Sequence, residues 1–169
     1  MKVKDIMTAA PETCRPNDNL AEAVELLWSA NCGVLPVTDH SGRVSGILTD
    51  RDICIALGTR NLRAADIPVE SVMATSVQTC QPTEDVLAAL GRMSDCRVRR
   101  LPVVDAANHL VGILSINDAV LSVGAGQHAV RPAAVLDAFK SICAHDLPVA
   151  TAQAHPSESP VPEGVLQAT

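Results

Sequence analysis

Gly46-Ile47-Leu48-Thr49-Asp50-Arg51-Asp52 joins a predicted strand to a predicted helix. The apolar residues 44–48 predict a short buried strand, and the helix is expected to begin near Thr49. A helix N-terminus presents free backbone N–H groups and the positive end of the helix dipole, so this junction can bind an anion. Thr49 and Asp52 are three residues apart, which places a hydroxyl and a carboxylate on the first helical turn.

The same phrase returns 66 residues later as Gly112-Ile113-Leu114-Ser115-Ile116-Asn117-Asp118. The offset holds without a gap at identical pairs that include Val3/Val69, Met7/Met73, Cys14/Cys80, Pro36/Pro102 and Asp52/Asp118. The chain therefore contains an internal duplication. One copy is too small to bury its own apolar face. We expect the two copies to pack about a pseudo-two-fold axis, which creates two equivalent clefts.

Each copy has the pattern helix, strand, turn, strand, helix. In the first copy the predicted elements are a helix capped by Asp18 and ending near Asn31, strands at 34–37 and 44–48 around a turn at 39–42, and a helix at 49–57 followed by Gly58. The apolar stripe of the first helix is predicted to comprise Leu20, Ala23, Val24, Leu27 and Trp28. Pro36 predicts an edge strand or a strand start. In the second copy, Thr83 is the predicted helix cap.

The chain divides into four predicted segments. They are a first repeat (1–60), a linker with the second repeat (61–126), an amphipathic helix (127–147) and a flexible tail (148–169). The third helix opens at Arg131-Pro132, and its predicted apolar face comprises Val135, Leu136, Phe139, Ile142 and Cys143. It lies outside the duplication, so it either caps the pair or docks on a second subunit.

Composition excludes several classes of function. Hydrophobic residues make up 47% of the 169 residues and aromatic residues only 1%, so aliphatic side chains must form the core. The net charge of −6 and the lack of stacking residues argue against nucleic-acid binding. No apolar run is long enough to span a membrane, and the six scattered cysteines indicate a cytoplasmic protein with reduced thiols. Neither a metal site nor a nucleophile–base–orienter set is present in the sequence pattern, so we expect no enzyme.

Residues 1–125 resemble a tandem cystathionine-β-synthase (CBS) domain pair, or Bateman module. The resemblance is carried by Val3-Lys4-Asp5-Ile6-Met7-Thr8, Leu35-Pro36-Val37-Thr38-Asp39, Leu101-Pro102-Val103-Val104-Asp105 and the two Gly-Ile-Leu-Thr/Ser-x-x-Asp junctions. It implies an α+β fold in which two repeats pack through small sheets. It also implies a regulatory module that binds AMP, ADP, ATP, NAD or S-adenosylmethionine and that forms a homodimer, either head-to-head or head-to-tail. No catalytic cofactor is implied, and the sequence names no protein target.

The resemblance also assigns roles to residues. Asp52 and Asp118 would hold ribose hydroxyls, because a carboxylate can accept hydrogen bonds from both hydroxyls of the diol. Thr49 and Ser115 would face phosphates, with Arg100 as a basic phosphate partner. The first repeat has Val34 at the position of Arg100, so a highly charged ligand would favour the cleft that Arg100 reaches. The remaining candidates are Thr13 and Thr79, which would line the base or ribose end, and Arg51, a further phosphate partner.

A second interpretation of the same residues stays open. Thr49-x-x-Asp52 and Ser115-x-x-Asp118 also fit a helix capping box, in which the side chains satisfy the first N–H groups of the helix. Arg100 would then belong to a solvated strand edge. On that interpretation the protein is a ligand-free dimerisation or assembly module. The two roles of the Thr/Ser-x-x-Asp pairs are compatible with each other.

Overall fold

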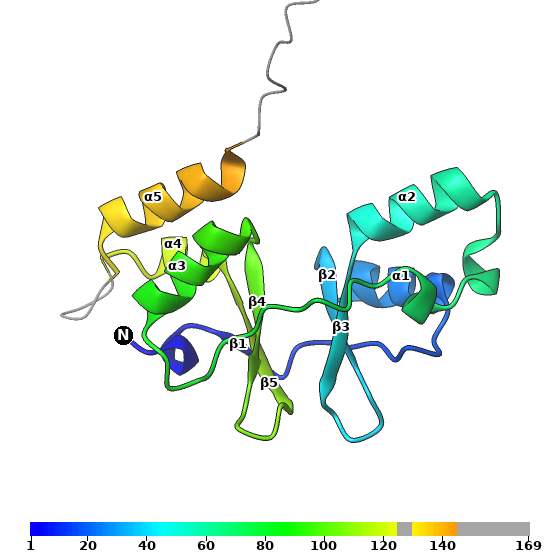
Figure 1. Ribbon diagram of the computed structural model, residues 1–169, viewed down its shortest axis with the longest axis horizontal. Coiled ribbons are helices and arrows are strands. Elements are labelled where there is room, and N and C mark those ends of the chain that lie inside the picture. Colours follow the sequence, from blue (N-terminus) through cyan, green and yellow to red (C-terminus); the bar gives the residue numbers. More distant parts are fainter. Residues whose placement is uncertain (125–129, 145–169) are drawn as a thin grey trace, which may run out of the picture.

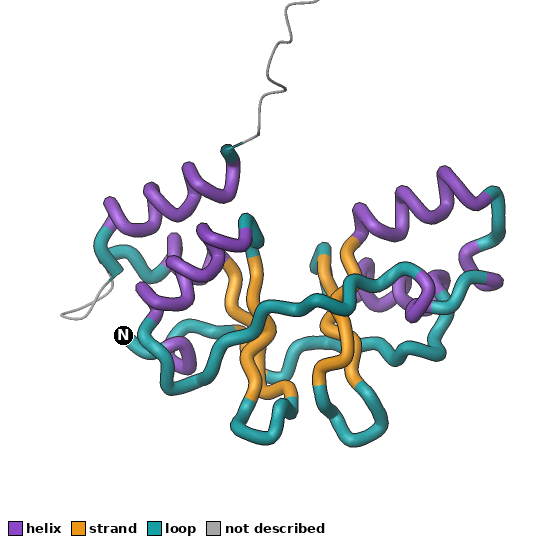
Figure 2. The backbone as a smooth tube through the Cα atoms, viewed as in Figure 1, coloured by secondary structure: helices purple, strands orange, loops and turns teal. Residues whose placement is uncertain are grey.

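The computed structural model describes residues 1–124 and 130–144, and their fold is α+β as predicted (Figure 1). Along the chain the elements are η1 (Val3–Asp5), β1 (Thr8–Ala9), α1 (Leu20–Ser29), β2 (Val34–Thr38), β3 (Val44–Thr49), α2 (Asp50–Arg60), η2 (Ala64–Asp66), η3 (Val69–Ser71), α3 (Val86–Cys96), β4 (Arg100–Val104), β5 (Leu110–Ser115), α4 (Ile116–Leu121) and α5 (Pro132–Cys143). Two hairpins form the centre, and the helices lie on the outer flanks (Figure 2).

The two hairpins repeat one another in register. Pro36 lies opposite Ile47 in the antiparallel pair β2–β3, and Pro102 lies opposite Ile113 in β4–β5. Each hairpin also has a bulge at the corresponding place. β2 is an edge of its two-stranded sheet, so the first alternative of the prediction for Pro36, an edge strand rather than a strand start, is confirmed, and β4 with Pro102 is likewise an edge of its sheet. The duplication in the sequence is thus a duplication of structure.

The short segments that precede each repeat are exchanged between the two halves. β1 pairs with β5 of the second repeat, and Ala74 forms the matching bridge to Ile47 of the first repeat. Val3 is fully buried in the core cluster of the second repeat, whereas Val69 is fully buried in that of the first. Each core is therefore completed by a segment from the other half of the pair.

Gly112 allows one of these crossing segments to approach its sheet. A Cβ atom at this position would lie 2.6 Å from the sulfur of Met7 and 3.0 Å from the carbonyl oxygen of Thr8. Gly46 faces Met73 in the same way on the other side of the pair. The glycines of the two Gly-Ile-Leu phrases are therefore packing positions for the exchanged strands.

The two cores are aliphatic, as the composition predicts, and each contains one buried thiol. Cys14 and Cys80 are each 2% exposed. Burial is the main cause that raises the pKa of both thiols from 9.0 to about 12, and the carboxylates of Asp18 and Glu84 add to it. Both are therefore neutral packing residues at neutral pH, whereas Cys54 and Cys96 are exposed.

Three helix ends differ from the prediction. The N-cap of α1 is Asn19 rather than Asp18, and its side-chain oxygen accepts hydrogen bonds from the N–H groups of Ala21 and Glu22. The N-cap of α3 is Asp85 rather than Thr83. Helix α2 continues past Gly58 to Arg60. Neighbouring polar residues can serve equally well as caps, so sequence alone places a helix end only to within a few residues.

The predicted apolar stripes of α1 and α5 are only partly buried. In α1, Leu20, Ala23 and Leu27 are buried, but Val24 is 42% exposed and Trp28 is 87% exposed. In α5 the buried residues are Val135, Ala138 and Ile142, while Leu136 and Phe139 are 54% and 44% exposed. The predicted faces were therefore too wide, because each helix packs against the molecule on one side only. The predicted tail, 148–169, lies outside the described residues.

Helix α5 covers the second repeat. It packs mainly on α3 and also on α4, and it lies outermost on that flank of the molecule (Figure 1). Val135, Ala138 and Ile142 belong to the same core cluster as Leu90 and Ala119. Helix α5 therefore caps the pair on the side of its second repeat.

We expect Gly112→Ala to destabilise the protein, because the added methyl group would collide with Met7 and Thr8. The cost should be about 1–3 kcal/mol of unfolding free energy, measured by urea denaturation. Gly58→Ala is the matched control, since nothing lies within 4 Å of its added Cβ in helix α2. It should stabilise the protein by about 0.5–1 kcal/mol. Equal effects of the two changes would contradict the packing role of Gly112.

We expect stability to fall as the pH rises from about 9 to about 12. Cys14 and Cys80 ionise near pH 9.0 in the unfolded chain but near pH 12 in the folded one. Within this window the unfolded state binds fewer protons, so each thiol lowers the unfolding free energy by at most about 1.4 kcal/mol per pH unit. The double variant Cys14→Ala with Cys80→Ala should show a shallower decline in urea titrations at stepped pH. If the unfolding free energy of the variant fell equally steeply with pH, the two thiols would not be the cause of the decline.

Candidate functional site

A cavity of about 400 Å³ opens between the two repeats. Its polar lining comes from both halves of the chain and includes Arg100, Ser115 and Asp118 of the second repeat with Glu12 and Asn31 of the first. Its apolar wall includes Pro11, Val34 and Ile113. Three of the residues singled out from the sequence are thus brought together around one cavity.

Local folding explains how these side chains reach the cavity. Arg100 is the first residue of β4, and it pairs directly with Ser115, the last residue of the neighbouring strand β5. Ser115 is also the N-cap of α4, so Asp118 lies one helical turn beyond it. The end of a hairpin and the start of a helix therefore place a guanidinium, a hydroxyl and a carboxylate at one end of the cavity.

Ser115 and Asp118 form a complete capping box. Oδ2 of Asp118 accepts hydrogen bonds from the backbone N–H of Ser115 at 2.7 Å and from its hydroxyl at 2.8 Å. The N–H of Asp118 donates to the Ser115 hydroxyl oxygen at 3.3 Å. Within the described part of the chain these capping bonds involve Oδ2, so Oδ1 has capacity to accept further bonds. The capping interpretation is confirmed, and it leaves room for a ligand.

Thr49 and Asp52 repeat this geometry in the first half. Oδ2 of Asp52 accepts bonds from the Thr49 N–H at 3.0 Å and from the Thr49 hydroxyl at 2.6 Å. Their surroundings differ, however. Asp52 borders a smaller hollow of about 200 Å³ that Arg60 and Ser71 also line. At the start of β2 the residue opposite Thr49 is Val34, where the second repeat has Arg100.

The other predicted residues lie outside the lining of the 400 Å³ cavity. Thr13 and Thr79 are half-buried, each beside a buried cysteine, and the Thr79 carbonyl accepts a 2.7 Å bond from Arg92. Arg51 is exposed on the first turn of α2. The structure therefore gathers the residues of the second Gly-Ile-Leu junction and Arg100, and it leaves these three apart from them.

Sequence reasoning missed the contribution of the first repeat to the cavity. Glu12, Asn31 and Cys32 line it, although none of them belongs to a repeated motif. Asn31 has a left-handed backbone conformation, with φ of 48°, where the chain leaves α1 and turns into β2. The predicted helix end near Asn31 was the only signal for this corner, and it indicated a turn rather than a cavity wall.

Two further properties bear on function. Among the helices of the described residues, none combines the length and apolar character needed to cross a bilayer. Within the same residues, no group of three or more histidine, cysteine or acidic side chains could hold a metal ion.

Sequence relatives and solved structures share the tandem arrangement. The CBS-domain-containing protein YhcV of Bacillus subtilis is 39% identical over 116 residues, which are 69% of this chain and 81% of YhcV. The CBS domain pair of protein MJ0100, solved with 5′-methylthioadenosine and S-adenosylmethionine, is 31% identical to this chain and has a TM-score of 0.66. The match covers 72% of this chain and 94% of the MJ0100 chain. CBSX2 in complex with AMP is 28% identical and has a TM-score of 0.63, and the match covers 71% of this chain and 93% of the CBSX2 chain.

Some matched relatives are larger enzymes, among them a homoserine O-acetyltransferase of Methanohalophilus mahii and an inosine-5′-monophosphate dehydrogenase of Mycobacterium leprae. This chain spans only 25% and 21% of their lengths. The family model for the CBS domain matches twice, at residues 3–59 and 69–124. The two matches begin 66 residues apart, which is the offset of the internal duplication, and the chain therefore belongs to the CBS domain family as a tandem pair.

Proposed function

We propose that this protein is a stand-alone regulatory module that binds an adenosine-containing ligand in the cavity at Arg100, Ser115 and Asp118. One observation carries the proposal. A cavity of about 400 Å³, within the size range of small-molecule sites, combines apolar walls with a guanidinium, a hydroxyl and a carboxylate. AMP and S-adenosylmethionine, the ligands of the similar CBS pairs, supply the matching groups. Catalysis is not part of the proposal.

The chemistry of an adenosyl ligand fits this set of groups. The ribose diol donates two hydrogen bonds, and Oδ1 of Asp118 can accept them while Oδ2 remains in the capping box. A phosphate or carboxylate pairs with the Arg100 guanidinium in a charge-assisted contact. The adenine ring has apolar side chains on which to lie, including Val34 and Ile113. The aspartate therefore both caps its helix and binds the ribose.

The first junction is the proposed second ligand position. Asp52 would take a ribose and Thr49 a phosphate there, with Thr13 and Thr79 at the base or ribose ends of the two clefts and Arg51 as an additional phosphate partner. Val34 lies opposite Thr49, at the position where the second repeat has Arg100 opposite Ser115. A charged ligand is therefore expected to prefer the cavity of Arg100.

The proposed response is a change in the relative angle of the two repeats. The cavity is lined by residues of both repeats, so a ligand that bridges them favours one arrangement over another. The effect would pass to a protein target through the surface of a homodimer in the cytoplasm. A ligand that bound both arrangements equally would shift nothing, so the proposal requires a difference in affinity.

The ligand-free assembly module is the second candidate function. The observation that favours it is that the residues of both capping boxes satisfy one another within the chain itself. Isothermal titration calorimetry with AMP, ATP, NAD and S-adenosylmethionine discriminates between the two functions. If the wild-type protein binds none of them at millimolar concentration, the assembly module is the better account.

We expect Asp118→Asn to weaken the binding of AMP by about 10- to 100-fold, because a charged hydrogen bond to the ribose becomes neutral. The asparagine oxygen can still accept the bond from the Ser115 N–H, so the helix cap is largely kept. Asp52→Asn is the matched control and should leave AMP binding in the cavity of Arg100 unchanged. Calorimetry measures both affinities, and thermal unfolding checks the fold. An equal loss of AMP affinity in the two variants would contradict the assignment of the AMP site to the cavity of Arg100.

We expect Arg100→Gln to weaken AMP binding by about 10- to 100-fold and to leave adenosine binding unchanged, because only AMP carries the charged group that the guanidinium meets. The neighbouring Arg99→Gln is the control for a general change in charge, since Arg99 is exposed and does not line the cavity. Calorimetry with both ligands gives the two affinity ratios. A similar loss for adenosine and AMP would show that Arg100 does not act on the phosphate.

A further inference from the structure

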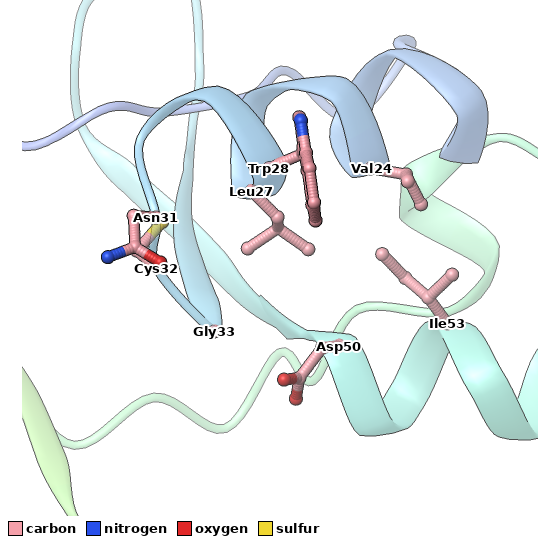
Figure 3. A pocket seen from close by; sticks show the side chains of 8 residues that line it. All are labelled: Val24, Leu27, Trp28, Asn31, Cys32, Gly33, Asp50 and Ile53. Carbon is pink, nitrogen blue, oxygen red and sulfur yellow. The ribbon is translucent and has the colours of Figure 1, made fainter.

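Helix α5 covers on the second repeat a helical face that is open on the first. Under the 66-residue offset, Val24 of α1 corresponds to Leu90 of α3, and Ile53 of α2 corresponds to Ala119 of α4. Val24 and Ile53 line an open groove of about 430 Å³ between α1 and α2, and Val24 is 42% exposed (Figure 3). Leu90 is 2% exposed and shares a core cluster with α5. Within the described part of the chain, the two repeats therefore differ in the cover of their outer helices.

One residue of the covered cluster lies inside the second Gly-Ile-Leu junction. Ile116 directly follows Ser115 as the first residue of α4, and it is 3% exposed in the same cluster as Val135 and Ala138 of α5. The equivalent residue of the first repeat is Asp50, which is exposed and lines the open groove (Figure 3). A carboxylate buried without a partner would be costly. The junction thus carries an apolar residue where its helix is covered and a charged residue where its helix is bare.

Helix α4 depends on its neighbours for stability. It has six residues, Ile116–Leu121, whereas α2 of the first repeat has eleven. The longer α2 is also tied at its far end, where the Arg60 guanidinium donates hydrogen bonds to the hydroxyl and the carbonyl of Ser71 at 2.8 and 2.6 Å. Short helices owe most of their stability to tertiary packing, and α4 packs on α5. The position of the first turn of α4 therefore depends on α5.

This first turn contributes to the cavity and to the α5 cluster at once. Ser115 and Asp118 line the cavity, while Ile116 and Ala119 are buried in the cluster. Arg100, the cationic group of the cavity, is held separately as the first residue of β4. A shift of the turn would thus move the hydroxyl and the carboxylate relative to the guanidinium. The docking of α5 and the spacing of the ligand-binding groups are therefore coupled through one helical turn.

The attachment of α5 is limited. Its buried side chains are Val135, Ala138 and Ile142, and the side chain of its N-cap, Arg131, makes no capping hydrogen bond. A hollow of about 350 Å³ remains between α3 and α5. Elements with few buried apolar contacts are the ones that open locally at a low cost in free energy. A ligand can therefore shift the docking of this helix.

We infer that ligand binding in the cavity of Arg100 and the docking of α5 on α3 and α4 are linked, which makes α5 the regulatory element of this site. A ligand held by Ser115 and Asp118 favours the position of the turn that α5 supports, so it tightens the docking of α5. Docked α5 tightens ligand binding by the same factor, because linkage between two binding equilibria is reciprocal. The inference rests on the ligand binding proposed above and adds its regulation.

Calorimetry with AMP on the full chain tests the linkage. Ile142→Ala trims the buried face of α5 without touching the cavity lining, and it should raise the dissociation constant for AMP about five- to twentyfold. Ile142→Val removes a single methylene group and should keep the affinity close to that of the wild type. Thermal unfolding checks that each variant is folded. Unchanged AMP affinity in folded Ile142→Ala overturns the inference.

Ile53→Ala is the matched control for a general loss of stability. Ile53 is 3% exposed in α2, belongs to the core of the first repeat and does not line the cavity of Arg100. The same truncation there should lower the unfolding temperature but leave the dissociation constant for AMP unchanged. An equal loss of AMP affinity in Ile53→Ala and Ile142→Ala would show that destabilisation alone weakens binding, and it would overturn the role of α5.

Hydrogen exchange follows the coupling in both directions. Without nucleotide, Ile142→Ala should speed amide exchange in α4, while exchange in α2 stays as in the wild type. Addition of AMP to the wild type should slow exchange in α5, although no residue of α5 lines the cavity. If α4 does not respond to the trimmed α5, the inference is overturned whether or not the protein binds AMP.

The linkage and the proposed function fail in different ways. A wild-type protein that binds AMP while exchange in α5 stays unchanged contradicts only the linkage. A wild-type protein that binds no adenosine-containing ligand contradicts the proposed function. In that case the nucleotide-free exchange of α4 in Ile142→Ala still decides whether α5 controls the second junction.

Discussion

The crossing of the N-terminal segments is the interaction on which the pair depends. β1 hydrogen-bonds to β5 of the opposite repeat, and Val3 and Val69 each fill the core of the other half. Neither repeat has a complete core without its partner's segment, so the two should fold as one cooperative unit. Gly46 and Gly112 make this possible, because a side chain at either position would push the crossing strand away.

The crossing also builds the cavity. Thr8 of β1 and the residues Ala10 to Glu12 line it beside the β4–β5 hairpin, to which β1 is paired, and the end of α1 and the start of β2 line it from the first repeat. The two hairpins are also tied together at their turns, where Leu110 N–H donates to the Gly42 carbonyl at 3.0 Å and Val44 N–H to that of Asn108 at 3.2 Å. The two hairpins are thus joined at their turns, and the cavity lies at the other end of the strands.

Pseudo-symmetry gives the protein two similar halves, and a few substitutions make them different. Arg100 stands opposite Ser115 where the first repeat has Val34 opposite Thr49, so the charge beside the two capping boxes differs while their geometry is nearly identical. Trp28 against Ser94 changes the outer helical face, and α5 covers only one of the two. The repeated residues thus maintain the fold, and the residues that break the repeat make the two halves differ in charge and in helical cover.

Much of this could be read from the chain itself. The 66-residue repeat, the hairpins around Pro36 and Pro102, the edge position of those prolines and the capping of Asp52 and Asp118 depend on local chemistry and periodicity, which neighbouring residues carry. The exchange of β1, the wall formed by Glu12 and Asn31, and the exposure of Trp28 could not be predicted in this way. An apolar stripe shows that a helix has a face to bury, but the neighbour that covers it is set by contacts distant in sequence. Only the tertiary packing decides that α5 covers Leu90 and leaves Val24 bare.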